Sequence, residues 1–246
     1  MRLHLHFRLE SPLVLPLNYQ QVIQGFIYHQ IQDRTYAQFL HNKGYTYENR
    51  QFRLFTFSRL LGQATVQLHT KTITFKNEVH LQISSCLPKF VQELGQSFLL
   101  QSSVQLNGHP LIIEEMRYQT QTVTESPCTI EMLSPITVHR TDKASDGRKV
   151  TKYFSPRDPA FEPLINENLS NKYAAYYGKQ MPSTIHIKPL QLGKRDKVIT
   201  RFKGFIIEGW NGTYQLQGDP EILTFASAVG LGARNSQGFG LPEVRN

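Results

Sequence analysis

The chain of 246 residues is 39% hydrophobic and 11% aromatic, so it can bury a core and suits one large domain or two of about 120 residues. Its formal net charge of +8 favours a polyanionic partner or an anionic membrane surface. Two cysteines lie far apart at Cys86 and Cys128, and no apolar run reaches the roughly 18 residues of a membrane span. These features argue against a disulfide framework, a cysteine zinc site and a membrane protein, and we expect a protein of the reducing cytoplasm.

The first ten residues alternate between apolar and polar side chains, and this period of two predicts a strand with one buried face. The opposite, basic face is expected to be exposed and carries Arg2, His4, His6 and Arg8. Residues 19–32 repeat Ile23, Ile27 and Ile31 at helical spacing, which predicts a helix that Asn18 can cap. A strand followed by a helix therefore opens the chain.

The rest of the first half has the pattern of three further strands and one helix. Branched and aromatic residues predict the strands at 52–61, 77–85 and 107–119. They also predict an additional arm at 64–76. The helix follows Pro88 and carries an apolar face of Phe90, Val91, Leu94 and Phe98. The order β-α-β-β-α-β is that of a ferredoxin-like unit, an antiparallel sheet with two helices on one face.

The second half repeats this order of elements without an internal sequence repeat. Its strands are predicted at 128–132, 184–192, 199–210, 213–217 and 238–244, its helices at 158–177 and 219–229, and a polar, basic loop at 140–152. Asn211-Gly212 is a strong hairpin signal, and Asp219-Pro220 suits the cap and first turn of a helix. We expect an α+β protein of tandem ferredoxin-like (RRM-like) domains, residues 1–122 and 123–246, with a C-terminal glycine-rich loop.

That loop, GLGARNSQGFG at 230–240, contains no acid and follows the last predicted helix. A Rossmann or P-loop motif would follow a strand and open a helix, and neither spacing is present, so a nucleotide cofactor is not expected. The loop can form a backbone nest for a polyanion, with Arg234 on phosphate and Asn235 or Ser236 on sugar or base edges. The local pattern equally allows a glycine C-cap followed by a bulged strand.

Basic residues also cluster at 140–157 and 188–203. Charge runs are often only solvated surface, but beside an acid-free loop and a basic strand they favour a protein that follows a phosphate backbone. We assign this contact to Lys43, Arg140, Lys188, Lys194, Arg201, Lys203, Gly232, Arg234, Asn235, Ser236 and Gly238.

Several segments together resemble the CRISPR-associated Cas6 family of the RAMP superfamily. They are GFIYHQI, FLHNKG and RLFTFS in the first half, with TIEMLSPITV and GLGARNSQGFG in the second. The resemblance spans residues 13–239 and implies an endoribonuclease built of tandem ferredoxin-like domains. It implies metal-independent cleavage of CRISPR precursor RNA within repeats, by 2′-hydroxyl attack that leaves a 2′,3′-cyclic phosphate and a 5′-hydroxyl and so generates crRNA.

The resemblance also implies the catalytic residues. It places His41 on the family's catalytic histidine, and Tyr28 on a helix tyrosine that contacts the scissile phosphate. Many relatives carry lysine where this chain has Arg53, and Lys43 is a nearby rival for the cation. Arginine stabilises charge on phosphorus but cannot donate a proton as an acid, so proton delivery would fall to His41 or water. His29 adjoins Tyr28 but faces about 100° away around the helix, and it ranks below His41.

Two other functions remain open at this point. A RAMP-type subunit could bind crRNA without cutting it, whereas a metal-dependent hydrolase would need clustered carboxylates and the 19 acids are scattered. His4 and His6 have a spacing that can hold a metal, yet the sequence shows no third ligand, so RNA contact or plain surface is expected. We predict no metal, no cofactor and no membrane partner. The expected partner is CRISPR repeat RNA (pre-crRNA and crRNA), with a homodimer and a CRISPR interference complex as open options.

Overall fold

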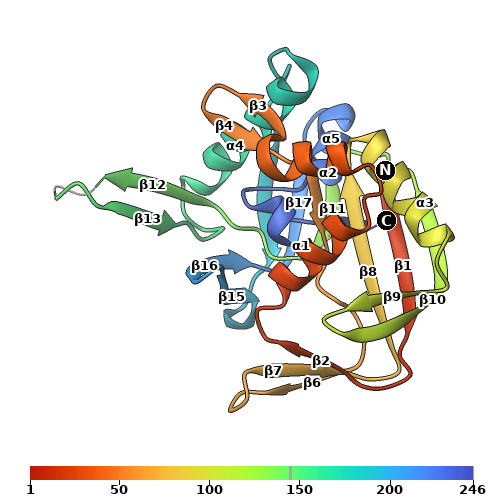
Figure 1. Ribbon diagram of the computed structural model, residues 1–246. Coiled ribbons are helices and arrows are strands. Elements are labelled where there is room, and N and C mark those ends of the chain that lie inside the picture. Colours follow the sequence, from red (N-terminus) through yellow and green to blue (C-terminus); the bar gives the residue numbers. More distant parts are fainter. Residues whose placement is uncertain (144–145, 246) are drawn as a thin grey trace.

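The computed structural model describes residues 1–143 and 146–245, which form two main antiparallel sheets, one from each half of the chain (Figure 1). Residues 144 and 145 of the predicted basic loop, and residue 246 at the end of the predicted second domain, lie outside the described residues. Among the helices of the described part, none is long and apolar enough to cross a membrane.

The first sheet is built from β1 (Arg2–Arg8), β5 (Phe55–Phe57), β8 (Glu78–Ser85), β9 (Ser103–Leu106) and β10 (His109–Gln119). Their order is β5-β8-β1-β10-β9, a split β-α-β unit with β9 added at one edge. The helices α1 (Gln20–His29) and α3 (Pro88–Leu99) pack on one face, where the ring of Phe7 meets those of Phe26 and Phe98. The opposite face of this sheet carries the polar residues of β1 and β8.

The second sheet is built from β11 (Cys128–Met132), β14 (His186–Gln191), β17 (Thr213–Gln217) and β18 (Pro242–Arg245), in the order β14-β17-β11-β18. Its helices are α4 (Phe161–Tyr177) and α5 (Pro220–Val229). Asp219 caps α5 as predicted, because its carboxylate accepts a hydrogen bond from the backbone of Glu221 at 2.8 Å. The two strand orders correspond, and the predicted fold of tandem ferredoxin-like domains is confirmed, while the exact division after residue 122 stays a prediction.

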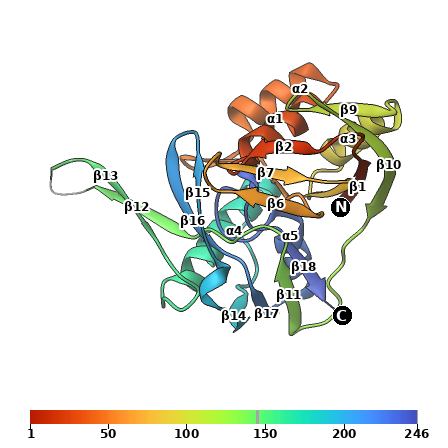
Figure 2. The same ribbon diagram turned by 90° about the horizontal axis from the view of Figure 1, so that it is seen from below.

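Smaller elements extend from this body. A three-stranded arm consists of β2 (Leu13–Pro16), β6 (Ala64–Gln67) and β7 (Thr72–Phe75). Three hairpins pair β3 (Tyr45–Tyr47) with β4 (Arg50–Phe52), β12 (His139–Lys143) with β13 (Lys149–Tyr153), and β15 (Lys197–Phe202) with β16 (Phe205–Trp210). The short helical elements are α2 (Arg34–Gln38), a π-helical turn (Phe39–Lys43) and two 3₁₀ turns (Lys194–Asp196 and Asn235–Gln237). The expectation of a loop at 140–152 is therefore wrong, since the described residues of this segment pair as the β12–β13 hairpin. Figures 1 and 2 both show this hairpin extending away from the body.

Two local signals in the sequence were misleading. Asn211-Gly212 does not close a hairpin, because β16 pairs with β15 while β17 leaves for the second sheet. The turn that joins β15 to β16 is Lys203-Gly204 instead. Asn18 does not cap α1, whose N-cap residue is Tyr19 with no side-chain cap. Tyr19 is buried and its hydroxyl accepts a hydrogen bond from the backbone of Leu60, so tertiary packing determines where the helix begins.

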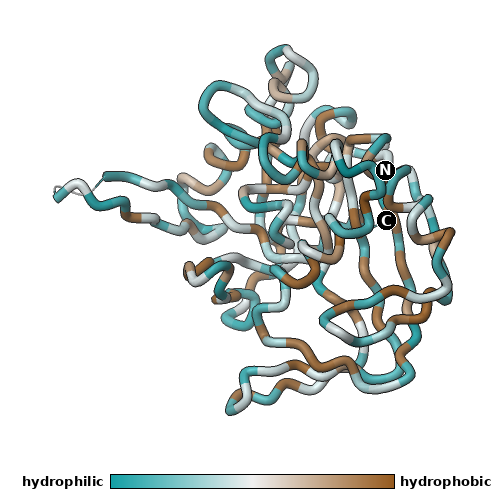
Figure 3. Tube along the Cα trace, in the orientation of Figure 1, coloured by the Kyte–Doolittle hydropathy of each residue, from teal (hydrophilic) through white to brown (hydrophobic). Residues whose placement is uncertain are grey.

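The strand alternation predicted for β1 is confirmed on its apolar side, since Leu3, Leu5 and Phe7 are all at most 2% exposed. Figure 3 shows the same alternation of hydrophobic and hydrophilic residues along the strands of the first sheet. The core is continuous between the two halves, because one buried cluster includes residues of both sheets and their helices. Because this buried cluster spans both halves, it fixes how they sit against each other.

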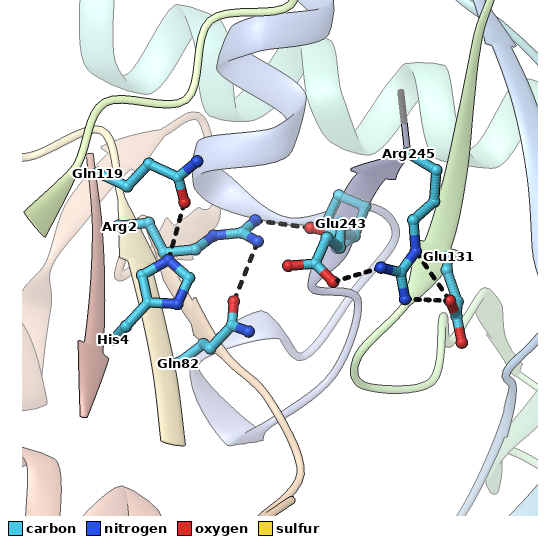
Figure 4. A network of polar contacts seen from close by, with 8 residues as sticks. Arg2, His4, Gln82, Gln119, Glu131, Glu243 and Arg245 are labelled. Carbon is cyan, nitrogen blue, oxygen red and sulfur yellow. Dashed lines mark hydrogen bonds and ion pairs between the residues drawn. The ribbon is translucent and has the colours of Figure 1, made fainter. Parts of the chain in front are cut away.

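The basic side of β1 differs from the expectation at Arg2, which is fully buried rather than exposed. Its guanidinium donates to the carbonyl oxygen of Pro242 at 2.6 Å and to Oε1 of Gln82 at 3.2 Å (Figure 4). Burial lowers its pKa to about 10, opposed by the charge of Glu243. Arg2 therefore joins the first sheet to the last strand of the second, a contact that alternation within one strand cannot reveal.

Candidate active site

A pocket of about 630 Å³ lies where the two halves meet. It is lined from the first half by the predicted catalytic residues and from the second by part of the glycine-rich loop and the β15–β16 hairpin. The predicted site residues that it brings together are Tyr28, His41, Arg53, Lys203, Arg234, Asn235 and Ser236. Residues more than 200 positions apart in the sequence thus share one cavity between the two halves, a common location for a binding site.

Tyr28 and His41 face each other in this pocket. Their ring centroids are 5.3 Å apart, with an angle of 78° between the planes. His41 is exposed, and its Nδ1 lies 2.8 Å from Oδ1 of Asn42, which leaves Nε2 as the nitrogen available for proton transfer. Tyr28 is half-buried, and this burial raises its pKa to about 12 despite the opposing effect of Arg53. Tyr28 is therefore a hydrogen-bond donor, not a base, at neutral pH.

A π-helical turn presents His41 to the pocket. Leu40 anchors the turn in the core with 0% exposure, and the backbone N–H of Gly44 closes it by donating to the carbonyl of Phe39 at 2.7 Å. Gly44 has a φ of +64°, and a Cβ there would lie 2.5 Å from the carbonyl oxygen of Phe52. Only glycine fits this end of the turn, and single π turns are frequent at functional sites.

Arg53 holds the same turn by donating hydrogen bonds to its backbone carbonyls. Its Nε donates to the carbonyl of Leu40 at 3.0 Å, and Nη2 donates to the carbonyl of His41 at 2.8 Å. A longer contact of 3.4 Å joins Nη2 to the carbonyl of Asn42. The guanidinium therefore positions the backbone that carries the histidine and also brings a positive charge to the pocket. Its rival Lys43 is exposed and does not line the pocket.

The glycine-rich loop docks onto the first half of the chain. Gln24 of α1 donates to the carbonyl of Ser236 at 2.6 Å, and Thr56 of β5 donates to the carbonyl of Phe239 at 2.9 Å. At Gly238, with a φ of +86°, a Cβ would lie 2.6 Å from the ring of Phe57. The glycines thus allow a close approach between the two halves, so the loop has a structural task besides any contact with a ligand.

Two of the loop's predicted ligand contacts differ in their surroundings. Arg234 is half-buried in left-handed backbone, donates to Oε1 of Gln237 at 3.2 Å and leaves its buried Nε without a partner among the described residues. Asn235 is only 7% exposed, and its amide donates to the carbonyls of Leu231 and Phe239 at 3.1 Å. Arg234 retains hydrogen-bonding capacity for a ligand, whereas the amide nitrogen of Asn235 is used to close the loop.

The pocket also contains residues that sequence reasoning missed. Lys172 of α4 is buried, and its Nζ donates to the carbonyls of Gly230 and Gly232 at 2.7 and 2.9 Å. Burial lowers the pKa of Lys172 to about 7. His139 lines the same pocket, and its pKa is lowered to about 4 by burial and then by the charges of Arg234 and Arg50. Helical spacing marked the segment around Lys172 as an ordinary helix, and nothing in the sequence pairs His139 with a distant arginine.

The remaining predicted contacts lie outside this pocket. Gly232 and Arg140 line a neighbouring pocket of about 390 Å³, and Gly238 lies against the ring of Phe57. Three exposed cations lie on the second half at the edge strand β14, a 3₁₀ turn and β15, namely Lys188, Lys194 and Arg201. These residues do not line the pocket, and their roles as contacts along an extended chain stay predictions.

Two ferredoxin-like sheets, with a glycine-rich loop between the last helix and the last strand, define a RAMP-type protein. The family model "CRISPR-associated protein Cas6, N-terminal" matches residues 14–117, and "CRISPR associated protein Cas6, C-terminal" matches residues 118–244. The chain belongs to the CRISPR-associated Cas6 family.

Curated relatives agree with this assignment. The CRISPR-associated endoribonuclease Cas6 of Pyrococcus furiosus is 27% identical over 94% of this chain and 83% of the relative. The CRISPR-associated endoribonuclease Cas6 1 of Methanocaldococcus jannaschii is 23% identical over 98% of this chain and 91% of the relative. The solved structure of a Cas6-related protein from Pyrococcus furiosus has the same fold, with a TM-score of 0.84 at 17% identity, covering 100% of this chain and 98% of that one.

Proposed function

We propose that this chain is an endoribonuclease that cleaves CRISPR precursor RNA within its repeats to generate crRNA, without a metal ion. The observation that carries the proposal is the meeting of Tyr28, His41 and Arg53 in one pocket beside the glycine-rich loop. The curated relatives are named as endoribonucleases of this kind, which supports the same reaction here. Membership of the family and the local geometry therefore point to the same chemistry.

The reaction assigns a step to each side chain. The 2′-oxygen of the ribose attacks the adjacent phosphorus while the bond from phosphorus to the 5′-oxygen breaks, giving a 2′,3′-cyclic phosphate and a 5′-hydroxyl. Nε2 of neutral His41 accepts the proton of the 2′-hydroxyl, and water supplies the proton of the leaving oxygen. Tyr28 donates a hydrogen bond to a phosphate oxygen, and the charge of Arg53 stabilises the negative charge that develops there.

The RNA would run from this pocket over the second half of the chain. Arg234, whose Nε has no partner among the described residues, offers its guanidinium to a phosphate, and Lys203 reaches the pocket rim from the β15–β16 turn. Phe205, which follows this turn at the start of β16, is 71% exposed and lines the pocket, a position from which a ring can stack on an unpaired base. In this proposal residues 1–122 supply the catalytic groups, and residues 123–246 supply most of the contacts to the RNA.

The proposal is tested by incubating labelled repeat RNA with the protein in EDTA and analysing the ends of the products. We expect a single cut per repeat that survives chelation and leaves a cyclic phosphate. A 2′-deoxy nucleotide at the cut site should abolish cleavage and preserve binding, because the attacking group is missing. Binding without any cleavage would favour a non-catalytic RNA-binding subunit, and cleavage that depends on added Mg²⁺ would favour a metal-dependent hydrolase.

A further inference from the structure

The polar face of the first sheet carries a cluster of metal-ligand side chains away from the proposed catalytic pocket. His6 of β1 is directly opposite His80 of β8, and Glu78 precedes His80 by two positions, so it points to the same face. The α1 and α3 helices pack on the opposite face, with Phe7. The sequence shows no third ligand for the pair His4 and His6. Cross-strand register, which places His80 beside His6, cannot be read from one strand.

The three side chains converge on one point. Nε2 of His6 lies 2.9 Å from one carboxylate oxygen of Glu78, and Nε2 of His80 lies 3.7 Å from the other. The ligand atoms all lie within 4.8 Å of one another. The two imidazoles are stacked, with ring centroids 4.3 Å apart and an angle of 14° between the planes. Two ring nitrogens and a carboxylate therefore lie close together, and a rotation of the nearly parallel rings would turn both nitrogen lone pairs toward one ion.

The sheet fixes these positions. β1 is hydrogen-bonded on both sides, to β8 and β10. On β8, the backbone of His80 exchanges two hydrogen bonds with Leu61, at 2.8 and 3.0 Å. The donors thus sit on rigid neighbouring strands, and binding an ion requires adjustment of side chains only, which keeps the conformational cost small.

Nearby cations are engaged with other acids. Arg8, which is opposite Glu78 in the strand register, donates to Glu114 at 2.6 Å. Arg117 pairs with Glu115 at 3.0 Å. The carboxylate of Glu78 is consequently left to the two imidazoles, and in the described part of the chain no arginine pairs with it.

The ligand types select a class of metal. Two imidazole nitrogens and one carboxylate are the protein ligands of zinc sites that keep a position open for water. Calcium and magnesium prefer oxygen ligands throughout, so this set disfavours them. A shallow pocket of about 190 Å³ adjoins the two histidines and gives room for a water or a small anion as the remaining ligand.

We propose that His6, Glu78 and His80 bind one divalent transition-metal ion of the zinc class, with a fourth position open to solvent. The site is independent of the proposed RNA cleavage, because none of its three residues lines the catalytic pocket and that cleavage needs no metal. It gives the protein a second binding function, a metal-dependent feature at the exposed end of the polar face of its first sheet.

The test uses the full chain with any affinity tag removed, first stripped with a chelator and then titrated with Zn²⁺ by calorimetry. Titration with Co²⁺ provides a second readout, because ligation by histidine in a site of low coordination number produces visible absorption. We expect one equivalent of either ion per chain. His80→Ala and Glu78→Gln should each weaken binding at least about tenfold, and circular dichroism should show that both variants remain folded.

A matched control is available at His186, which pairs with Glu162 at 3.2 Å on an exposed surface. It reproduces one histidine and one carboxylate without the second histidine, so His186→Ala should leave the affinity unchanged. Failure of the stripped, folded protein to take up one equivalent of either ion would overturn the proposal. So would wild-type affinity in His80→Ala, or a loss of affinity in His186→Ala equal to that in His80→Ala. RNA cleavage is not a readout, so these outcomes are separate from the test of the proposed function.

Discussion

Replacing Arg53 with lysine separates the two tasks that the structure gives this side chain. The substitution keeps a positive charge, but a lysine ammonium cannot reproduce the fork that holds the carbonyls of Leu40 and His41 at 3.0 and 2.8 Å. A hydrogen bond from a charged donor is worth about 1.5–3 kcal/mol, and the low end applies because Arg53 is half-exposed. Loss of one of the two bonds should cost about 1.5 kcal/mol, which corresponds to a roughly tenfold slower chemical step.

Single-turnover cleavage of labelled repeat RNA, with protein in excess, measures this step directly. The dissociation constant for RNA should change little in Arg53→Lys because the charge is kept. Arg53→Ala removes the charge as well and should slow cleavage by roughly 10²–10³, the cost of losing one electrostatic contact to the developing oxyanion. If Arg53→Lys cleaves as fast as the wild type, the carbonyl contacts do not hold His41 and the reasoning is refuted. Near-wild-type cleavage by Arg53→Ala would refute both roles.

Three further predictions test the surroundings of the site. Tyr28→Phe should slow single-turnover cleavage about tenfold without moving the pH–rate profile, because the hydroxyl, with its pKa raised to about 12, acts as a donor. In the folded chain the pKa of Lys172 is about 7, so the unfolded chain binds this proton more tightly. The free energy of unfolding of the wild type should therefore rise between about pH 7 and 10, by up to about 4 kcal/mol relative to Lys172→Met. Urea unfolding at a series of pH values measures this difference. Gly238→Ala should lower the free energy of unfolding by about 1–3 kcal/mol more than Gly178→Ala. Both glycines have positive φ, so the backbone strain is shared. An added Cβ would meet nothing within 4 Å at Gly178 but would meet the ring of Phe57 at Gly238.

The order of elements was predictable because it depends on local patterns. Alternation identified β1, helical spacing identified α1 and α3, and the pair Asp219-Pro220 identified the start of α5, each from interactions within a few residues. A β-α-β-β-α-β order has few compact solutions, so the two sheets followed from it. The signals at Asn18 and Asn211-Gly212 failed because tertiary packing decided where those segments begin and pair.

The chemistry of the site could be predicted only in part. Tyr28, His41 and Arg53 were proposed through resemblance, and the structure brings them together without testing their roles. Lys172 and His139 could not be identified, because their altered pKa values arise from burial and from charges supplied by distant segments. The same limit applies to Arg2, whose partner Pro242 lies at the other end of the chain.

The glycine-rich loop shows why a single motif can carry two interpretations. The sequence allowed either a cradle for a polyanion or a structural turn. In the structure, Gly238 and the amide of Asn235 serve the fold, while Arg234 lines the pocket with an Nε that has no partner in the described part of the chain. Loops that carry function on a rigid scaffold commonly combine both tasks, and here the docking onto α1 and β5 determines where Arg234 points.

The most direct test of the account compares His41→Ala with His29→Ala in single-turnover cleavage in EDTA. His29 is exposed at the end of α1, next to Tyr28 in sequence, and does not line the pocket, so it controls for the loss of one imidazole. The account predicts that His41→Ala binds repeat RNA as the wild type does but cleaves it roughly 10²–10⁴ times more slowly, while His29→Ala cleaves normally. Equal rates for the two variants would show that the imidazole at position 41 does not transfer the proton.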